Sequence, residues 1–191
     1  MGIEFEMKYQ ATPAQQDALA KIFPQRWDTI SMETTYYDTP DRLLGSQKTT
    51  LRRRMENGEA VCTVKTPEKD GARGEWDCRC EDIHQAIPEL CKLGGPAVLQ
   101  TLGSGLEEVC GARFTRRCTL IVTESFTAEL ALDRGVLLGA GQEAALCEVE
   151  LELKDGDREA MLLYARFLAA RFSLSPQHKS KFRRALELTQ K

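Results

Sequence analysis

The chain has 191 residues, of which 42% are hydrophobic and 29% are charged, and these values are ordinary for a soluble globular protein. It carries 26 lysines and arginines against 29 aspartates and glutamates, so its formal net charge is −3. Because proteins that bind duplex nucleic acids normally carry a basic excess, we expect no nucleic-acid partner.

No apolar run approaches the roughly 18 residues that a membrane-spanning helix requires, so no membrane partner is expected. The N-terminus is already charged at Glu4 and lacks the apolar core of a signal peptide. Seven cysteines are scattered without a Cys-x-x-Cys pair, which suits a reducing compartment better than a disulfide scaffold. We therefore predict a cytoplasmic protein.

The first half of the chain alternates between short strands and turns. Runs that alternate or are rich in β-branched and aromatic residues predict strands at 3–9, 27–37, 49–55, 60–66 and 72–80. Asn57-Gly58 predicts a hairpin between the third and fourth of these, and Lys69-Asp70-Gly71 introduces the fifth. Thr12-Pro13 predicts the start of a helix that ends at about Phe23.

The second half contains a helical stretch before the strands resume. Proline and glycine punctuate short helical pieces over 81–110, which indicates an insert or cover. Further strands are predicted at 113–123, 127–133 and 144–153, followed by C-terminal helices within 157–189. Roughly eight strands with short turns predict an antiparallel barrel or sandwich.

Charged residues occupy one face of several predicted strands, because residues two apart on a strand share a face. An antiparallel sheet often has one solvated face, and charged residues are common there. Rows of like charge nevertheless repel unless something compensates them. These rows are Glu4 with Glu6, Arg52 with Arg54, and Glu148 with Glu150 and Glu152. A divalent cation would compensate the carboxylates, a polyanion would compensate the arginines, and a metal-bound triphosphate would do both.

Eight motifs occur in a fixed order along nearly the whole chain. They are Glu4-Phe5-Glu6-Met7-Lys8, Tyr37-Asp38-Thr39-Pro40, Leu51-Arg52-Arg53-Arg54, Thr63-Val64-Lys65-Thr66-Pro67, Arg73-Gly74-Glu75, Glu129-Leu130-Ala131-Leu132-Asp133-Arg134-Gly135, Glu148-Val149-Glu150-Leu151-Glu152-Leu153 and Ser180-Lys181. The first motif alone is a common pattern of charges. The ordered set resembles the CYTH family, also called the triphosphate tunnel metalloenzymes.

The resemblance implies an α+β fold: an eight-stranded antiparallel β-barrel, open as a tunnel with a charged lumen and flanked by helices. The apolar strand faces would then turn outward against the helices. Residues 1–191 would form a single CYTH domain, with the helical insert at about 81–110 and C-terminal helices at about 157–189. Members often carry a second, all-helical domain after the barrel, and we expect this chain to lack it.

The resemblance also implies roles for individual residues. The metal ligands, for Mg²⁺ or Mn²⁺, would be Glu4, Glu6, Glu148 and Glu150. The triphosphate-binding residues would be Lys8, Arg52, Arg54, Lys65, Arg73, Arg116 and Lys181. The catalytic residues would be Lys8, Glu75 and Asp133. Side chains alternate between the two faces of a strand, so alternation alone allows either Arg113 and Arg117 together, or Arg116, to face the lumen. The resemblance favours Arg116.

The function implied is metal-dependent hydrolysis of the terminal phosphate of a small-molecule triphosphate. Inorganic tripolyphosphate is the expected substrate, because nothing in the sequence indicates a pocket for a base or a thiazole ring. The alternatives are a class IV adenylate cyclase that makes cyclic AMP from ATP, and a triphosphate-binding module without catalysis. The sequence does not distinguish Mg²⁺ from Mn²⁺ and does not indicate an oligomeric state.

Overall fold

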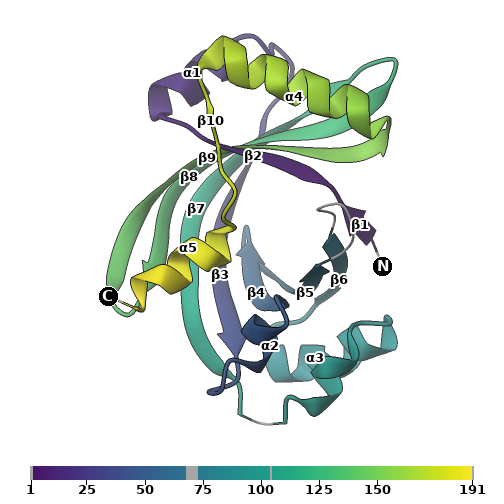
Figure 1. Ribbon diagram of the computed structural model, residues 1–191, viewed down its shortest axis with the longest axis vertical. Helices are drawn as coiled ribbons and strands as arrows, with labels where there is room; N and C mark the ends of the chain where they lie inside the picture. The colour runs from purple at the N-terminus through teal and green to yellow at the C-terminus, as the bar shows by residue number, and fades with distance from the viewer. Residues whose placement is uncertain (1, 68–72, 104, 191) are drawn as a thin grey trace.

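The computed structural model describes residues 2–67, 73–103 and 105–190, and its strands form one curled antiparallel sheet (Figure 1). The strand order across the sheet is β1-β6-β5-β4-β3-β7-β8-β9-β2-β10. The strands are β1 Gly2–Glu4, β2 Glu6–Gln10, β3 Asp28–Asp38, β4 Thr50–Glu56, β5 Glu59–Pro67, β6 Arg73–Arg79, β7 Glu107–Val122, β8 Phe126–Gly139, β9 Gln142–Gly156 and β10 Ser175–Pro176.

The N-terminal segment joins the two ends of the curled sheet. β1 pairs with β6 and β2 pairs with β9, while only Phe5 separates β1 from β2. If β1 and β2 are counted as the strand predicted at 3–9, and the two-residue β10 is set aside, the described part of the sheet has the eight expected strands. The ladder is interrupted at Phe5, so the sheet is barrel-like rather than a closed barrel. The predicted fold class is confirmed.

The predicted strands of the first half agree closely with the structure. β3, β4 and β5 each begin and end within one residue of the ranges predicted at 27–37, 49–55 and 60–66. The hairpin at Asn57-Gly58 is present between β4 and β5, with both residues at positive φ. The turn predicted at 69–71 and the predicted start of the next strand at Ala72 lie outside the described residues.

The three strands predicted in the second half are all longer than expected; β9, predicted at 144–153, runs from Gln142 to Gly156. β7 begins at Glu107, inside the stretch predicted as a helical insert, and β8 continues past Asp133 to Gly139. Gly135 lies within β8 instead of ending it, because a Cβ at this position would lie 2.2 Å from the main-chain oxygen of Arg113 on β7. The glycine therefore permits a close approach of two strands rather than a turn.

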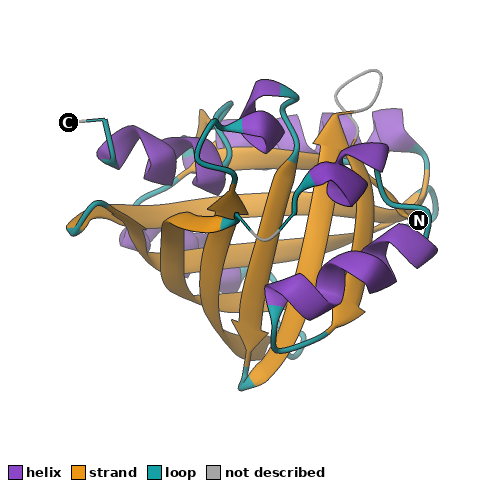
Figure 2. Ribbon diagram, turned by 90° about the horizontal axis from the view of Figure 1, so that it is seen from below, coloured by secondary structure: helices purple, strands orange, loops and turns teal. Residues whose placement is uncertain are grey.

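The helices lie mainly outside the curled sheet (Figure 2). They are α1 Pro13–Lys21, α2 Leu43–Ser46, α3 Ile83–Lys92, the 3₁₀ helix η2 Ala97–Thr101, α4 Arg158–Phe172 and α5 Lys181–Leu188. Thr12 forms a capping box with Gln15 at the start of α1, and the Asp157 carboxylate accepts from Ala160 N at the start of α4, as these residue types predict. Among the described helices, none combines the length and apolar character needed to cross a bilayer.

Two hydrophobic clusters cover the outer faces of the sheet. The first packs α1 and α4 against β2, β8 and β9, with Leu130 and Leu151 fully buried under Met161 and Leu168. The second packs α3 and η2 against β4, β5 and β6. The apolar residues of each strand are therefore directed outward, and the charged residues between them in the sequence are directed into the curl.

Helix α5 packs differently, because it lies against the inner side of the sheet. Its residues Ala185 and Leu188 are buried in a third cluster with Leu137 of β8 and Leu146 of β9. At its start, Lys181 and Phe182 line the interior of the curl. Helix α5 therefore fills one end of that interior.

The Tyr37-Asp38-Thr39-Pro40 motif has a structural role here. Asp38 is buried at the end of β3, and its carboxylate accepts hydrogen bonds from the main-chain nitrogens of Thr39, Leu44 and Gly45. These bonds fix the short helix α2, which the sequence analysis did not predict. Two of these contacts, from Leu44 and Gly45, satisfy donors that the start of this helix would otherwise leave unpaired.

Gln16 links α1 to the strands that carry Asp133 and Glu148. Its side chain is only 1% exposed, and its Nε2 donates to the main-chain oxygens of Asp133 at 3.0 Å and Glu148 at 2.7 Å. Arg134 Nε donates to Gln16 Oε1 at 3.0 Å.

Gln16→Leu should lower the free energy of unfolding by about 2–3 kcal/mol, because it leaves the buried main-chain oxygens of Asp133 and Glu148 without this donor. Denaturant unfolding measures this, with the exposed Gln25→Leu as control; equal stability of the two variants would contradict it.

Candidate functional site

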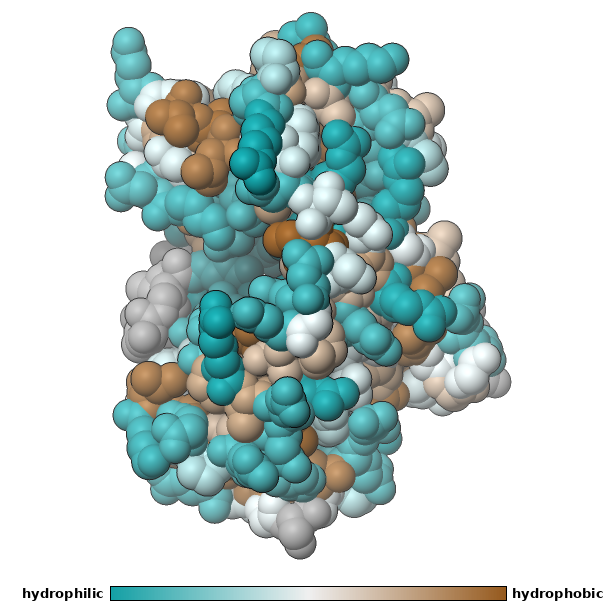
Figure 3. All heavy atoms as spheres, turned by 180° about the vertical axis from the view of Figure 1, so that it is seen from behind, coloured by the Kyte–Doolittle hydropathy of each residue, from teal (hydrophilic) through white to brown (hydrophobic). Residues whose placement is uncertain are grey.

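A cavity of about 300 Å³ lies inside the curled sheet. Seen from behind, the molecule is hollowed at mid-height, and the hollow is lined by hydrophilic residues (Figure 3). Eleven of the residues predicted to form the site line the cavity: Glu4, Glu6, Lys8, Arg52, Arg54, Lys65, Arg73, Glu75, Arg116, Glu150 and Lys181. The cavity therefore brings together residues from seven strands and from α5.

The two-residue period of the strands explains this convergence. On β4, Leu51 belongs to the outer cluster and Arg53 donates to the main-chain oxygen of Glu81, whereas Arg52 and Arg54 line the cavity. A strand that buries its apolar residues under a helix must direct the intervening charged residues to the opposite side.

One wall of the cavity carries more positive charge than the nearby carboxylates neutralise. We call this wall the basic side. It is formed by Arg52, Arg54, Lys65 and Arg73 on β4, β5 and β6. Arg54 is only 8% exposed, yet its guanidinium has one hydrogen bond, to Thr34 Oγ1, and its ion-pair partner Glu56 lies 3.6 Å away. Burial, with Arg52 next in effect, lowers the pKa of Arg54 to about 10. An anion bound here would relieve this shortage of negative charge.

Lys65 and Arg52 show the same shortage. Burial and the neighbouring Arg52 lower the pKa of Lys65, although Lys65 Nζ lies 2.5 Å from Glu4 Oε2 and 3.3 Å from Glu75 Oε1. Arg52 has its Nε without a hydrogen-bond partner among the described residues, and its nearest carboxylate, Glu75, lies 3.7 Å away. Guanidinium groups with free donors are suited to phosphate oxygens.

The opposite imbalance occurs on the acidic side, which we define as Glu4, Glu6, Glu129 and Glu152. Burial, followed by repulsion from Glu150, raises the pKa of Glu6 even though Lys8 Nζ lies 2.7 Å from it. Burial also raises the pKa of Glu152, with smaller contributions from Glu4 and Glu129, although Lys154 Nζ lies 2.8 Å from it and opposes the shift. Carboxylates that repel one another in a partly buried site form the donor set that a hard divalent cation prefers.

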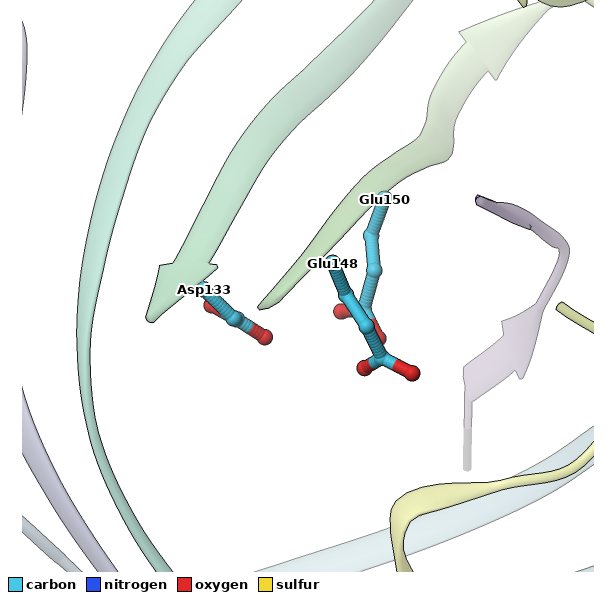
Figure 4. A group of neighbouring side chains, drawn as sticks. All are labelled: Asp133, Glu148 and Glu150. Atoms are coloured by element: carbon cyan, nitrogen blue, oxygen red, sulfur yellow. The ribbon is translucent and has the colours of Figure 1, made fainter. Parts of the chain in front are cut away.

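Beside the acidic side, six charged residues form a balanced group, the Lys181 cluster: Asp133, Glu148, Glu150, Arg116, Lys181 and Arg184. Oxygens of Asp133, Glu148 and Glu150 lie within 4.8 Å of one another, and the three side chains project from β8 and β9 toward one region (Figure 4). Lys181 Nζ lies 2.8 Å from Asp133, 2.6 Å from Glu148 and 2.6 Å from Glu150.

The arginines complete this cluster. Arg116 donates to both carboxylate oxygens of Asp133, at 2.8 and 2.7 Å, and also pairs with Glu150, while Arg184 pairs with Glu148. Burial alone would raise the pKa of Glu150, but Lys181 and Arg116 hold it well below its usual range. The cluster is therefore compensated internally, unlike the basic and acidic sides.

The structure also distinguishes the three arginines around residue 116. Arg116 lies in the cavity, Arg113 pairs with Glu143 at 3.3 Å on the exposed surface, and Arg117 lies over the Trp27 ring. Only the first of them is placed to contact a bound ligand.

Two predicted site residues do not line the cavity. Asp133 and Glu148 are 0% exposed and lie behind Lys181 and Arg116, so neither is placed to contact a substrate. Conversely, Asp77 and Lys154 line the cavity without having been predicted. Lys154 continues the row that ends at Glu152, and Asp77 lies two residues after Glu75 and so on the same strand face, so extending each pattern by one step would have found them. No comparable signal identifies Arg184.

The fold and the cavity define the class of protein: an antiparallel β-tunnel whose interior is lined with basic and acidic side chains. Within this class, the chain belongs to the CYTH domain family, whose domain matches residues 2–186.

Several known proteins resemble the chain. The inorganic triphosphatase of Haemophilus influenzae is 30% identical over 142 residues, which cover 73% of this chain and 40% of that protein. The thiamine-triphosphatase of Homo sapiens is 28% identical over 174 residues, covering 84% of this chain and 68% of that enzyme. A Hippeastrum protein with a dominant triphosphatase activity has a TM-score of 0.67 at 18% identity, covering 99% of this chain and 97% of its own, which demonstrates the shared fold. The chain thus spans less than half the length of the Haemophilus relative.

Proposed function

We propose that the protein hydrolyses the terminal phosphate of a triphosphate with the help of a divalent cation, Mg²⁺ or Mn²⁺, and that inorganic tripolyphosphate is its substrate. The observation that carries this proposal is the division of one cavity into an under-neutralised basic side and an under-neutralised acidic side. A polyanion with its bound cation matches both. The similarity to an inorganic triphosphatase and a thiamine-triphosphatase supports the same class of substrate.

The basic side would hold the phosphate chain. Arg52 and Arg54 present planar forks to phosphate oxygens, and Lys65 and Arg73 extend the positive charge along β5 and β6. Lys65 is paired with Glu4, so an arriving phosphate would compete for the ammonium and release that carboxylate. No part of this wall requires an organic group on the substrate.

The acidic side would hold the cation. Burial and repulsion from Glu150 raise the pKa of Glu6, whereas for Glu4 burial is outweighed, mainly by Lys65, and the pKa is lowered. When bound there, a divalent cation would neutralise phosphate oxygens and stabilise the charge that develops during hydrolysis. Lys8, which pairs with Glu6 at 2.7 Å, would be freed to contact phosphate.

Hydrolysis then requires positioning more than covalent chemistry by the protein. The oxygen of a water molecule bonds to the terminal phosphorus, the bond from that phosphorus to its bridging oxygen breaks, and pyrophosphate leaves. We assign Glu75 to orient the water and accept its proton, since this partly exposed carboxylate borders Lys65 and Arg52. The basic side stabilises the charge that moves onto the leaving group.

Phosphate release tests this proposal. The full chain should release phosphate from tripolyphosphate in the presence of Mg²⁺ or Mn²⁺, and an excess of chelator should abolish the release. Thiamine triphosphate, ATP and GTP are tested in parallel to establish the substrate range. Cyclic AMP and pyrophosphate from ATP would instead indicate a cyclase, and tight tripolyphosphate binding without turnover would indicate a binding module; either result would contradict the proposal.

A further inference from the structure

We infer that the buried acidic group of Asp133, Glu148 and Glu150 is closed to divalent cations because the ammonium of Lys181 is its permanent counter-ion. This inference rests on the proposed function only in taking the cavity to be where a divalent cation binds. It removes Glu148 from the predicted metal ligands. Exchangeable metal binding is then confined to the acidic side.

The geometry of Lys181 supports a resident cation. Its Nζ lies within 2.8 Å of one oxygen from each of the three carboxylates, which is the position that a shared cation would take. The side chain is only 8% exposed, so solvent ions have little access to its contacts with the three carboxylates. Three positive groups, those of Lys181, Arg116 and Arg184, face three negative ones, leaving no net charge to attract a further cation.

On the acidic side, the lysines that pair with Glu4, Glu6 and Glu152 themselves line the cavity. Glu4 and Glu6 each have a single lysine within 3 Å, namely Lys65 and Lys8, and both lysines line the cavity where phosphate can draw them away. Lys181 is held instead by its helix, since Ala185 and Leu188 of α5 are buried against the sheet. Lys181 thus positions α5 across one end of the cavity rather than exchanging between carboxylate and phosphate.

Counting bound Mn²⁺ tests the inference without relying on activity. The metal-free full chain is titrated with Mn²⁺ in the absence of triphosphate, and free Mn²⁺ is measured by electron paramagnetic resonance. Lys181→Met should bind one more Mn²⁺ per chain than the wild type. Lys181→Arg, which keeps a cation in place, and Lys179→Met, which removes an exposed lysine of the same segment, should match the wild type. An unchanged count in a folded Lys181→Met would overturn the inference.

A second pair of variants tests the inference by removing carboxylates instead of the lysine, and this test does not depend on whether Lys181→Met folds. Glu148→Gln and Asp133→Asn remove carboxylates from the buried group in a chain that keeps Lys181. Both should bind as many Mn²⁺ ions as the wild type, and the loss of one ion in either variant would overturn the inference. Phosphate release from tripolyphosphate is recorded in parallel on the wild-type chain. Its absence would contradict the proposed hydrolysis, while the Mn²⁺ counts would still decide the status of the buried group.

Discussion

Replacement of Glu6 by glutamine is expected to lower metal-dependent phosphate release from tripolyphosphate by at least about 100-fold. The change keeps the size of the side chain but removes a carboxylate that the proposed cation requires. Loss of even a partner of a metal ligand costs about 10- to 100-fold in activity or affinity, so loss of a ligand itself should cost at least as much. Steady-state phosphate release and Mn²⁺ affinity should fall together.

The effect on folding should be small, because Glu6 is under repulsion in the empty protein. Burial and Glu150 raise its pKa, so a neutral side chain removes an unfavourable charge even as Lys8 loses a partner. Glu33→Gln is the matched control, since Glu33 is an exposed glutamate on the outer face of β3. Retained metal-dependent phosphate release in Glu6→Gln would remove this residue from the metal site.

Replacement of Arg54 by methionine is expected to have opposite effects on activity and stability. Tripolyphosphate turnover should fall by about 10²- to 10³-fold, the loss that follows removal of one group stabilising developing negative charge. The free energy of unfolding should rise by about 1 kcal/mol or more, since a buried guanidinium without a close carboxylate costs free energy in the empty protein. Its pKa, lowered to about 10 by burial and by Arg52, reflects the same cost.

Arg53→Met is the control for both measurements. Arg53 is the next residue of β4, directed to the outer face, where it donates to the main-chain oxygen of Glu81 at 3.2 Å. It should retain activity close to that of the wild type and should not gain stability. A lower free energy of unfolding in Arg54→Met would contradict the prediction, because it would show that Arg54 stabilises the fold without a bound anion.

The sequence alone determined which side chains share a strand face. On β4 and β5, the two-residue period separates Arg52, Arg54 and Lys65 from the apolar residues between them, and this alternation is a local property of any extended strand. The resemblance carried by the ordered motifs then indicated the family and predicted that the charged faces line a tunnel. Along 113–117, however, parity allowed two answers, and the pairing of Arg116 with Asp133 on the neighbouring strand decided between them.

Only the tertiary structure decided how deep each side chain lies and which charge it meets. Glu148, Glu150 and Glu152 share one face of β9, yet Glu148 is fully buried, Glu150 borders the cavity and Glu152 belongs to the acidic side. The difference arises because α5, some thirty residues later in the chain, packs Lys181 against one end of that row. A strand's own pattern fixes direction but carries no information about what a distant helix places over it, since burial and charge pairing are set by long-range packing.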